Sequence, residues 1–250
     1  MTLELTLTTP VADTVFYPET DGIPMGESDL HRKIMFHIIH LLERFFAGQQ
    51  VYVTGNLILY YERGNPRKSI VPDCFVAPGV EPRLRPIYKL WEEPAGPQVV
   101  FEVSSKSTQR EDLGAKMRVY AQLGVQEYYI YDPTGDYLNP PLAAFQWVGG
   151  GYVPMPPVNE EPPLSTWLLA PEASAPPEFL SRALGLRLTL DADGQLQFYD
   201  AETGARLLSD EEARQQAEAA AQQAQERAAR AEATAARLQE ELDRLRGGNT

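Results

Sequence analysis

The sequence predicts an α/β (α+β) fold: a mixed central sheet flanked by helices, followed by one long C-terminal helix. Apolar strands at 51–61 and 70–77 are joined by a turn at 64–68, which favours antiparallel pairing. A strand, a helix and another strand follow within 99–132, the pattern of a crossover unit. From Ser209 the composition changes to Ala, Gln, Glu and Arg, which indicates a separate helical segment.

The composition is that of an ordinary globular protein. Of the 250 residues, 43% are hydrophobic and 23% are charged. The single cysteine, Cys74, allows no intrachain disulfide. Because it is a small residue in an apolar strand, we expect it to pack in the core rather than to act as a nucleophile. No stretch approaches the roughly 18 apolar residues of a membrane span. We therefore expect a cytoplasmic protein without a signal peptide or membrane segment.

The net charge of −13 restricts how the chain can bind nucleic acid. Proteins that bind DNA through its phosphates usually carry a basic surface. We therefore expect any contact with DNA to be local or assisted by a metal ion.

A first helix is predicted after an extended arm at 1–24. Ser28 or Asp29 is a suitable N-cap, apolar residues then recur with a period near 3.6, and Gly48 ends the pattern. Glu27, just before the cap, can either interact with the helix dipole or point into a neighbouring site.

All three histidines lie on this helix. His37 and His40 are three residues apart, so they form a geometrically allowed metal pair. Solvated or packed histidines explain the same pattern without any ligand, and we favour that interpretation.

Two apolar strands, which we expect to be buried, each carry one carboxylate. Asp73 stands in the first and Glu102 in the second. Buried acids are unfavourable unless they are paired or bind a metal. If the two strands are neighbours, these two side chains can hold one Mg²⁺, with the carbonyl of Val103 as a third oxygen ligand. In the preceding strand, Gly55 with the following asparagine indicates a bulge or a close approach of another backbone.

Two lysines are candidates to act beside these acids. The strand period of two places Glu102, Ser104 and Lys106 on one face. The helical period places Lys116 on one face with Asp112, and with Tyr120 a turn further on. A lysine there can orient a water molecule or offset the charge of a phosphate.

Two hairpins and a heptad repeat follow. The hairpins span 143–155 and 186–199, and they flank a proline-rich stretch at 156–177. We expect one domain at 1–208, with its core at about 25–200, and a coiled-coil helix at 209–246 that pairs weakly or through a partner. Every a and d position of the repeat is apolar: Ala217, Ala221, Ala224, Ala228, Ala231, Ala235, Leu238, Leu242 and Leu245.

The order of these motifs resembles the Uma2 family of restriction-endonuclease-like proteins. The resemblance rests on Pro72-Asp73, on 101–108 beginning Phe-Glu-Val-Ser-Ser-Lys, and on the helix with Asp112, Lys116 and Tyr120. It extends from about 25 to 208. It implies a PD-(D/E)XK nuclease fold with Mg²⁺, or alternatively Mn²⁺, at the Asp and the Glu.

The resemblance also implies roles for single residues. Asp73 and Glu102 correspond to the two acids of the motif, and Glu27 to an acid that such folds add to the metal shell. The sequence departs from the pattern at Ser104, where the motif has its lysine. Lys116 is our first choice as the substitute, since it matches a lysine of the family's helix, and Lys106 is the second.

Two functions remain open at this point. The first is a Mg²⁺-dependent DNA endonuclease, a hydrolase of phosphodiester bonds, forming a homodimer or joining another coiled-coil partner through its tail. The second is a nuclease fold with weak or no catalysis that acts as a binding or assembly module through the tail. Ser104 and the net charge of −13 favour the second. The sequence specifies no DNA sequence or structure preference, oligomeric state or biological role.

Overall fold

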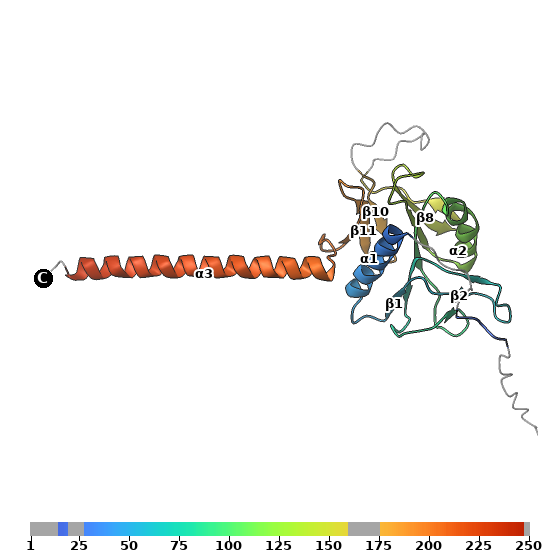
Figure 1. The fold of residues 1–250 in the computed structure, drawn as a ribbon, viewed down its shortest axis with the longest axis horizontal. Coiled ribbons are helices and arrows are strands. Elements are labelled where there is room, and N and C mark those ends of the chain that lie inside the picture. The colour runs from blue at the N-terminus through green and yellow to red at the C-terminus, as the bar shows by residue number, and fades with distance from the viewer. Residues whose placement is uncertain (1–14, 20–27, 160–175, 248–250) are drawn as a thin grey trace, which may run out of the picture. The chain divides into compact units, whose positions relative to one another are not determined.

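A mixed six-stranded sheet forms the centre of the protein (Figure 1). The computed structural model describes residues 15–19, 28–159 and 176–247. Glu27 thus lies outside the described residues. Across the sheet the strands follow the order β1 (Val51–Thr54), β4 (Cys74–Pro78), β6 (Val99–Val103), β7 (Glu127–Tyr131), β8 (Leu142–Val148) and β9 (Gly151–Pro154).

The predicted mixture of strand directions is confirmed. Strands β6 and β7 are parallel, with Val99 opposite Glu127, whereas the other neighbouring pairs are antiparallel. The parallel pair is joined by the predicted crossover. This connection consists of the π-helix η1 (Glu111–Lys116) and the α-helix α2 (Met117–Leu123), which ends at Gly124 in the left-handed conformation (φ 73°). The π-helical turn is a feature that the sequence did not predict.

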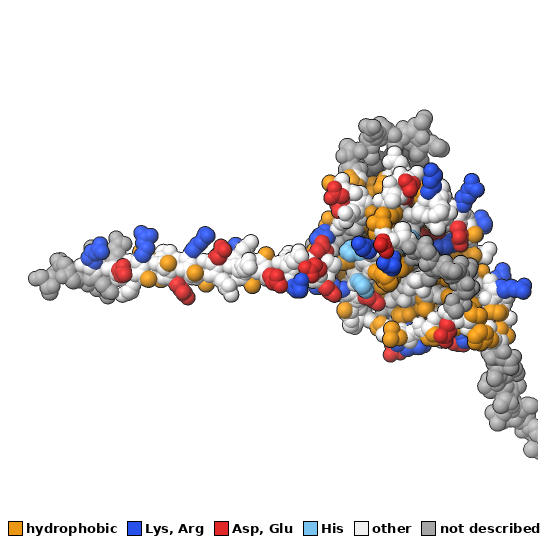
Figure 2. All heavy atoms as spheres, viewed as in Figure 1, with side chains coloured by type: hydrophobic (Ala, Val, Ile, Leu, Met, Phe, Trp, Pro, Cys, Tyr) orange, Lys and Arg blue, Asp and Glu red, His pale blue; other side chains and the backbone are white. Residues whose placement is uncertain are grey.

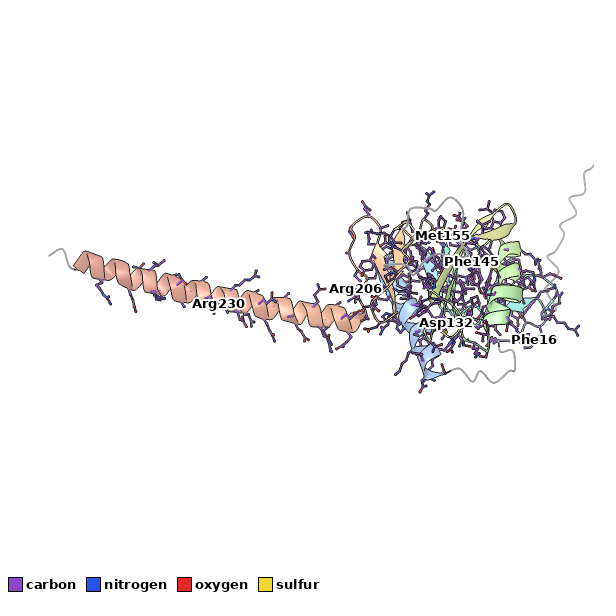
Figure 3. The ribbon with its side chains drawn as sticks, turned by 90° about the horizontal axis from the view of Figure 1, so that it is seen from above. Phe16, Asp132, Phe145, Met155, Arg206 and Arg230 are labelled. Carbon is purple, nitrogen blue, oxygen red and sulfur yellow. The ribbon has the colours of Figure 1, made fainter. Side chains whose placement is uncertain are left out.

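The two helical layers cover opposite faces of the central sheet (Figures 1 and 3). Helix α1 (Asp29–Phe45) begins at the predicted cap, where the Ser28 side chain accepts a hydrogen bond from the backbone of His31. Its buried residues pack with alternate residues of the strands, including Val99, Phe101 and Val103 of β6. The intervening residues of the strands face the α2 side, where a second apolar cluster forms.

The small sheet β10 (Phe179–Ser181), β11 (Leu186–Leu190) and β12 (Leu196–Asp200) completes the α1 side of the core. The hairpin of β11 and β12 was predicted, and β10 is a third strand that the sequence analysis missed. A further sheet of two-residue strands has the order β3 (Ser69–Ile70), β2 (Leu59–Tyr60) and β5 (Tyr88–Lys89).

The predicted strand 51–61 is wrong as a single element, because it splits into β1 and β2. The first strand ends at Thr54, just before Gly55, and Asn56 takes a positive φ of 52°. A Cβ atom at Gly55 would lie 1.8 Å from the carbonyl oxygen of Asp73, so the close backbone approach expected there is present.

The chain divides into two compact units, Met1–Leu207 and Leu208–Thr250. The second contains helix α3 (Asp210–Gly247), and the side chains from Arg214 to Glu240 are exposed, with small apolar side chains lying between charged ones (Figure 2). Across the described parts of the chain, no helix combines the length and the apolar character needed to cross a bilayer.

Candidate active site

Asp73 and Glu102 meet at the junction of β4 and β6. Cys74 pairs with Phe101, and the next pair along the same register sets Asp73 opposite Glu102. Glu102 alternates with Phe101 and Val103 along β6 and therefore faces the α2 side of the sheet. Asp73 lies immediately before the first residue of β4. Both are buried, with relative exposures of 9% for Asp73 and 1% for Glu102.

Each carboxylate oxygen of Asp73 has a nitrogen partner. The backbone N–H of Val103 donates to Oδ2 over 2.7 Å, and Nε2 of His31 lies 3.3 Å from Oδ1. Burial alone would raise the pKa of Asp73. The nearby imidazole of His31 and the positive charge of Lys116 outweigh burial, so the pKa of Asp73 lies below its ordinary value.

Glu102 is held by a lysine and a tyrosine from the helix that follows its strand. Lys116 Nζ lies 2.8 Å from Oε2, and the Tyr120 hydroxyl donates to Oε1 over 2.5 Å. Burial raises the pKa of Glu102 well above its ordinary value; Lys116 opposes this shift, whereas the nearby charges of Asp73 and Asp112 add to it. The charged form of Glu102 is thus disfavoured by its surroundings, and a nearby cation would stabilise it.

Asp112 contributes a third buried carboxylate through the π-helical turn. Its Oδ1 lies 3.4 Å from Lys116 Nζ, and its Oδ2 accepts a hydrogen bond of 2.5 Å from the Ser104 hydroxyl. The backbone carbonyl of Asp112 accepts from Tyr128 over 2.9 Å. Ser104, which stands at the place of the motif lysine, therefore acts by fixing the acid that contacts Lys116.

Lys116 remains a cation in this environment. Burial alone would lower its pKa, but the charges of Glu102, then Asp73 and Asp112, raise the pKa well above the ordinary lysine value. A lysine in this state donates hydrogen bonds and supplies positive charge, and it does not serve as a base at neutral pH.

The charge balance and the donor atoms fit a divalent cation of the Mg²⁺ type. In the described part of the chain, three buried carboxylates (Asp73, Glu102 and Asp112) surround the single ammonium group of Lys116. Full ionisation of all three would leave negative charge in excess, and the burial that raises the pKa of Glu102 opposes that state unless a cation is bound. Among the described residues, no three His, Cys, Asp or Glu side chains are arranged as a metal-binding group. Mg²⁺, however, is commonly bound by one or two carboxylates and retained water.

The other predicted site residues are placed differently. The side chain of Lys106 is exposed, and its backbone carbonyl accepts a hydrogen bond from Gln109. The structure therefore brings Lys116, and not Lys106, to the acids. Val103 contacts Asp73 through its N–H, and the role of its carbonyl as a ligand stays a prediction. Cys74 is fully buried in the core, and burial raises the pKa of its thiol.

His31 is the residue that the sequence analysis missed. It had singled out His37 and His40, but both of these are exposed, and His40 stacks on Phe36. One signal was available in the sequence. His31 lies three, four and seven positions before Ile34, Met35 and Ile38 of the apolar stripe, so it continues the face that packs on the sheet.

Acids on neighbouring strands of a mixed sheet, with a lysine on the helix that follows, define a nuclease-like class of fold and site. The model of the Uma2 family, described as "Putative restriction endonuclease", matches residues 20–178, and the chain belongs to this family. The comparison with curated proteins finds no match.

The solved structures that are similar to part of the chain include a bacterial protein. It is described as "a putative nuclease belonging to DUF820 from Anabaena variabilis ATCC 29413". The identity is 13% and the TM-score 0.40, over 55% of this chain and 74% of the other.

Proposed function

We propose that this protein is a divalent-metal-dependent endonuclease that hydrolyses phosphodiester bonds of DNA. The observation that carries the proposal is the meeting of Asp73, Glu102 and Lys116, from three separate segments, in one buried cluster where carboxyl groups outnumber ammonium groups. Membership of the Uma2 family supports it.

Asp73 and Glu102 would hold the cation, which is Mg²⁺ or Mn²⁺. When bound, the ion neutralises phosphate charge and promotes the ionisation of water. Val103 and Tyr120 keep the two carboxylates in place. Lys116, as a protonated donor, would bind a phosphate oxygen and offset the charge that develops on it.

The test is cleavage of supercoiled plasmid with Mg²⁺ or Mn²⁺ by the wild type, Asp73→Asn, Lys116→Met and Lys106→Met. We expect cleavage by the wild type. The first two variants should lose more than the roughly 10- to 100-fold that follows the loss of an outer-shell partner. Lys106→Met is the matched control, since the exposed Lys106 side chain should be dispensable.

Two outcomes would contradict this assignment. Unchanged cleavage by Asp73→Asn would remove the carboxylate site from the reaction. Calorimetric binding of Mn²⁺ by the wild type without cleavage of any DNA would favour the alternative function, a nuclease fold kept as a binding module.

We also propose that α3 pairs with the α3 of a second copy. The support is a row of exposed apolar side chains at heptad spacing, from Ala217 to Leu238. The Leu238 side chain is 56% exposed. Sedimentation equilibrium of the full chain should show a dimer that Ala231→Glu weakens, since this change places a charge in the seam. A monomer at every concentration would contradict the pairing.

A further inference from the structure

The imidazole of His31 meets Asp73 from the opposite layer of the fold. Helix α1 packs on the face of the sheet away from α2, yet Nε2 in its first turn lies 3.3 Å from Asp73 Oδ1. Both side chains are largely shielded, with side-chain exposures of 16% for His31 and 12% for Asp73. The contact therefore crosses from one helical layer to the carboxylates of the other.

The start of α1 is fixed at this residue. The Ser28 side chain accepts the backbone N–H of His31 over 3.1 Å, which satisfies one of the free donors at the helix terminus. Packing of Met35 and Ile38 on the sheet fixes the rotation of the helix. A capped and packed helix thus presents the imidazole in a defined place.

The polar groups around the two acids are arranged in a comparable way, with His31 at ion-pair distance from Asp73 rather than in a hydrogen bond. Glu102 has Tyr120 on one oxygen and Lys116 on the other. Asp73 has the N–H of Val103 on one oxygen and His31 on the other. A carboxylate oxygen has two lone pairs, so each retains one for a cation after accepting a hydrogen bond.

We propose that His31 is a positioning residue of the cation site, holding Asp73 Oδ1 through its Nε2 so that the carboxylate is oriented before the cation binds. This inference rests on the proposed function. Loss of a group that hydrogen-bonds to a metal ligand commonly lowers the metal affinity by about 10- to 100-fold. Mg²⁺ prefers oxygen ligands, which agrees with an imidazole that acts through Asp73 rather than as a ligand.

The test is calorimetric titration of the full-length protein with Mn²⁺, comparing the wild type with His31→Leu, His31→Gln and His40→Leu. His31→Leu removes the donor and should weaken binding about 10- to 100-fold. His31→Gln keeps an N–H donor and should recover most of the affinity. His40→Leu is the matched control on the same helix, because His40 is exposed. Thermal melting of each variant without metal confirms that it is folded.

A second measurement needs no variant. Imidazole nitrogen resonances of the wild type are followed during a Mg²⁺ titration. The Nε2 resonance of His31 should shift with the binding isotherm, while that of His40 stays unchanged.

The outcomes separate this inference from the proposed function. If the wild type binds no Mn²⁺ or Mg²⁺, both fail. If the wild type binds and His31→Leu binds equally well, or the His31 resonance does not respond, only the positioning role is overturned. If His31→Gln is as weak as His31→Leu, the imidazole is needed for itself, and the positioning role is overturned as well.

Discussion

Glu102 and Glu127 are buried carboxylates on the adjacent parallel strands β6 and β7, but their partners differ in kind. Glu127 Oε1 accepts the backbone N–H groups of Arg182 and Ala183 over 2.9 and 3.1 Å. Its Oε2 accepts the hydroxyls of Tyr129 and Ser181. All four donors to Glu127 are neutral, whereas Glu102 faces a lysine and two further acids.

The two arrangements indicate two uses of a buried acid. Glu127 joins β7 to the segment after β10 and thereby attaches the small sheet to the central one. Its hydrogen-bonding capacity is filled by the fold itself. Glu102 lies near the carboxyl end of its strand, among charges that do not balance, which is the pattern of functional sites. Burial alone does not separate the two residues, because both are buried.

The largest expected effect comes from making the same substitution at both glutamates. Glu102→Gln should reduce DNA cleavage by at least about 100-fold, the lower range for a positioned acid–base group. The free energy of unfolding should change little, because burial already raises the pKa of Glu102 and so disfavours its charged form. Glu127→Gln should keep cleavage but lower the free energy of unfolding by about 2 kcal/mol, because the amide nitrogen that replaces one oxygen cannot accept the hydrogen bonds which that oxygen accepts. Plasmid cleavage and urea unfolding measure the two quantities. The reverse pattern would invert the assignment of the two sites.

The sequence predicted those features that depend on local periodicity. The cap at Ser28 and the apolar stripe of α1 both follow from neighbouring residues. The sequence singled out Asp73 and Glu102 as acids in apolar segments and left open whether their strands are neighbours; the pairing of β4 with β6 brings the two segments side by side.

Features set by tertiary contacts could not be read in this way. The break between β1 and β2 follows from the approach of Gly55 to the Asp73 backbone, 18 positions later in the printed sequence. The hydrogen bond from Ser104 to Asp112 joins the end of β6 to the π-helical turn, so the role of Ser104 is understood only in three dimensions. His31 was missed because its partner lies on a distant strand.

A substitution at Gly55 should disturb the backbone next to Asp73 and leave the surroundings of Glu127 unchanged. The Cβ of Gly55→Ala would meet the Asp73 carbonyl oxygen at 1.8 Å and the side chain of Ile39 at 2.7 Å. Relief requires movement of backbone, so we expect a loss of about 3 kcal/mol in the free energy of unfolding, at the upper end for overpacking. Affinity for Mn²⁺ should fall as Asp73 shifts, while the contacts of Glu127 are spared.

The matched control for this change is Gly114→Ala in η1. The nearest atom to its Cβ would be Arg118 Nη1 at 3.9 Å, an ordinary contact. Its stability should be unchanged or raised by up to about 1 kcal/mol, since alanine restricts the unfolded chain. Equal unfolding midpoints for the two alanine variants would show that the close approach at Gly55 is not a constraint.

The smallest expected effect concerns Asp132, a second buried acid whose hydrogen-bond donors are neutral. It accepts hydrogen bonds from the backbone N–H groups of Tyr137 and Leu138 and from the hydroxyl of Thr134. Burial alone would raise the pKa of Asp132, but these donors, led by Tyr137, lower it. Because its folded pKa lies below the unfolded one, its contribution to stability is present above the unfolded pKa. That contribution is lost as the pH falls through the folded pKa.

Asp132→Asn should therefore lower the free energy of unfolding by about 1 kcal/mol at neutral pH, the scale of one hydrogen bond. The difference from the wild type should shrink as the pH falls below about 4, where an unperturbed aspartate becomes protonated. Urea unfolding of both proteins at pH 7 and in acid measures this difference. If the difference in free energy of unfolding stayed constant from pH 7 into acid, the hydrogen bonds around Asp132 would not favour its ionised form. Buried acids held by neutral donors would then not form one class with Glu127.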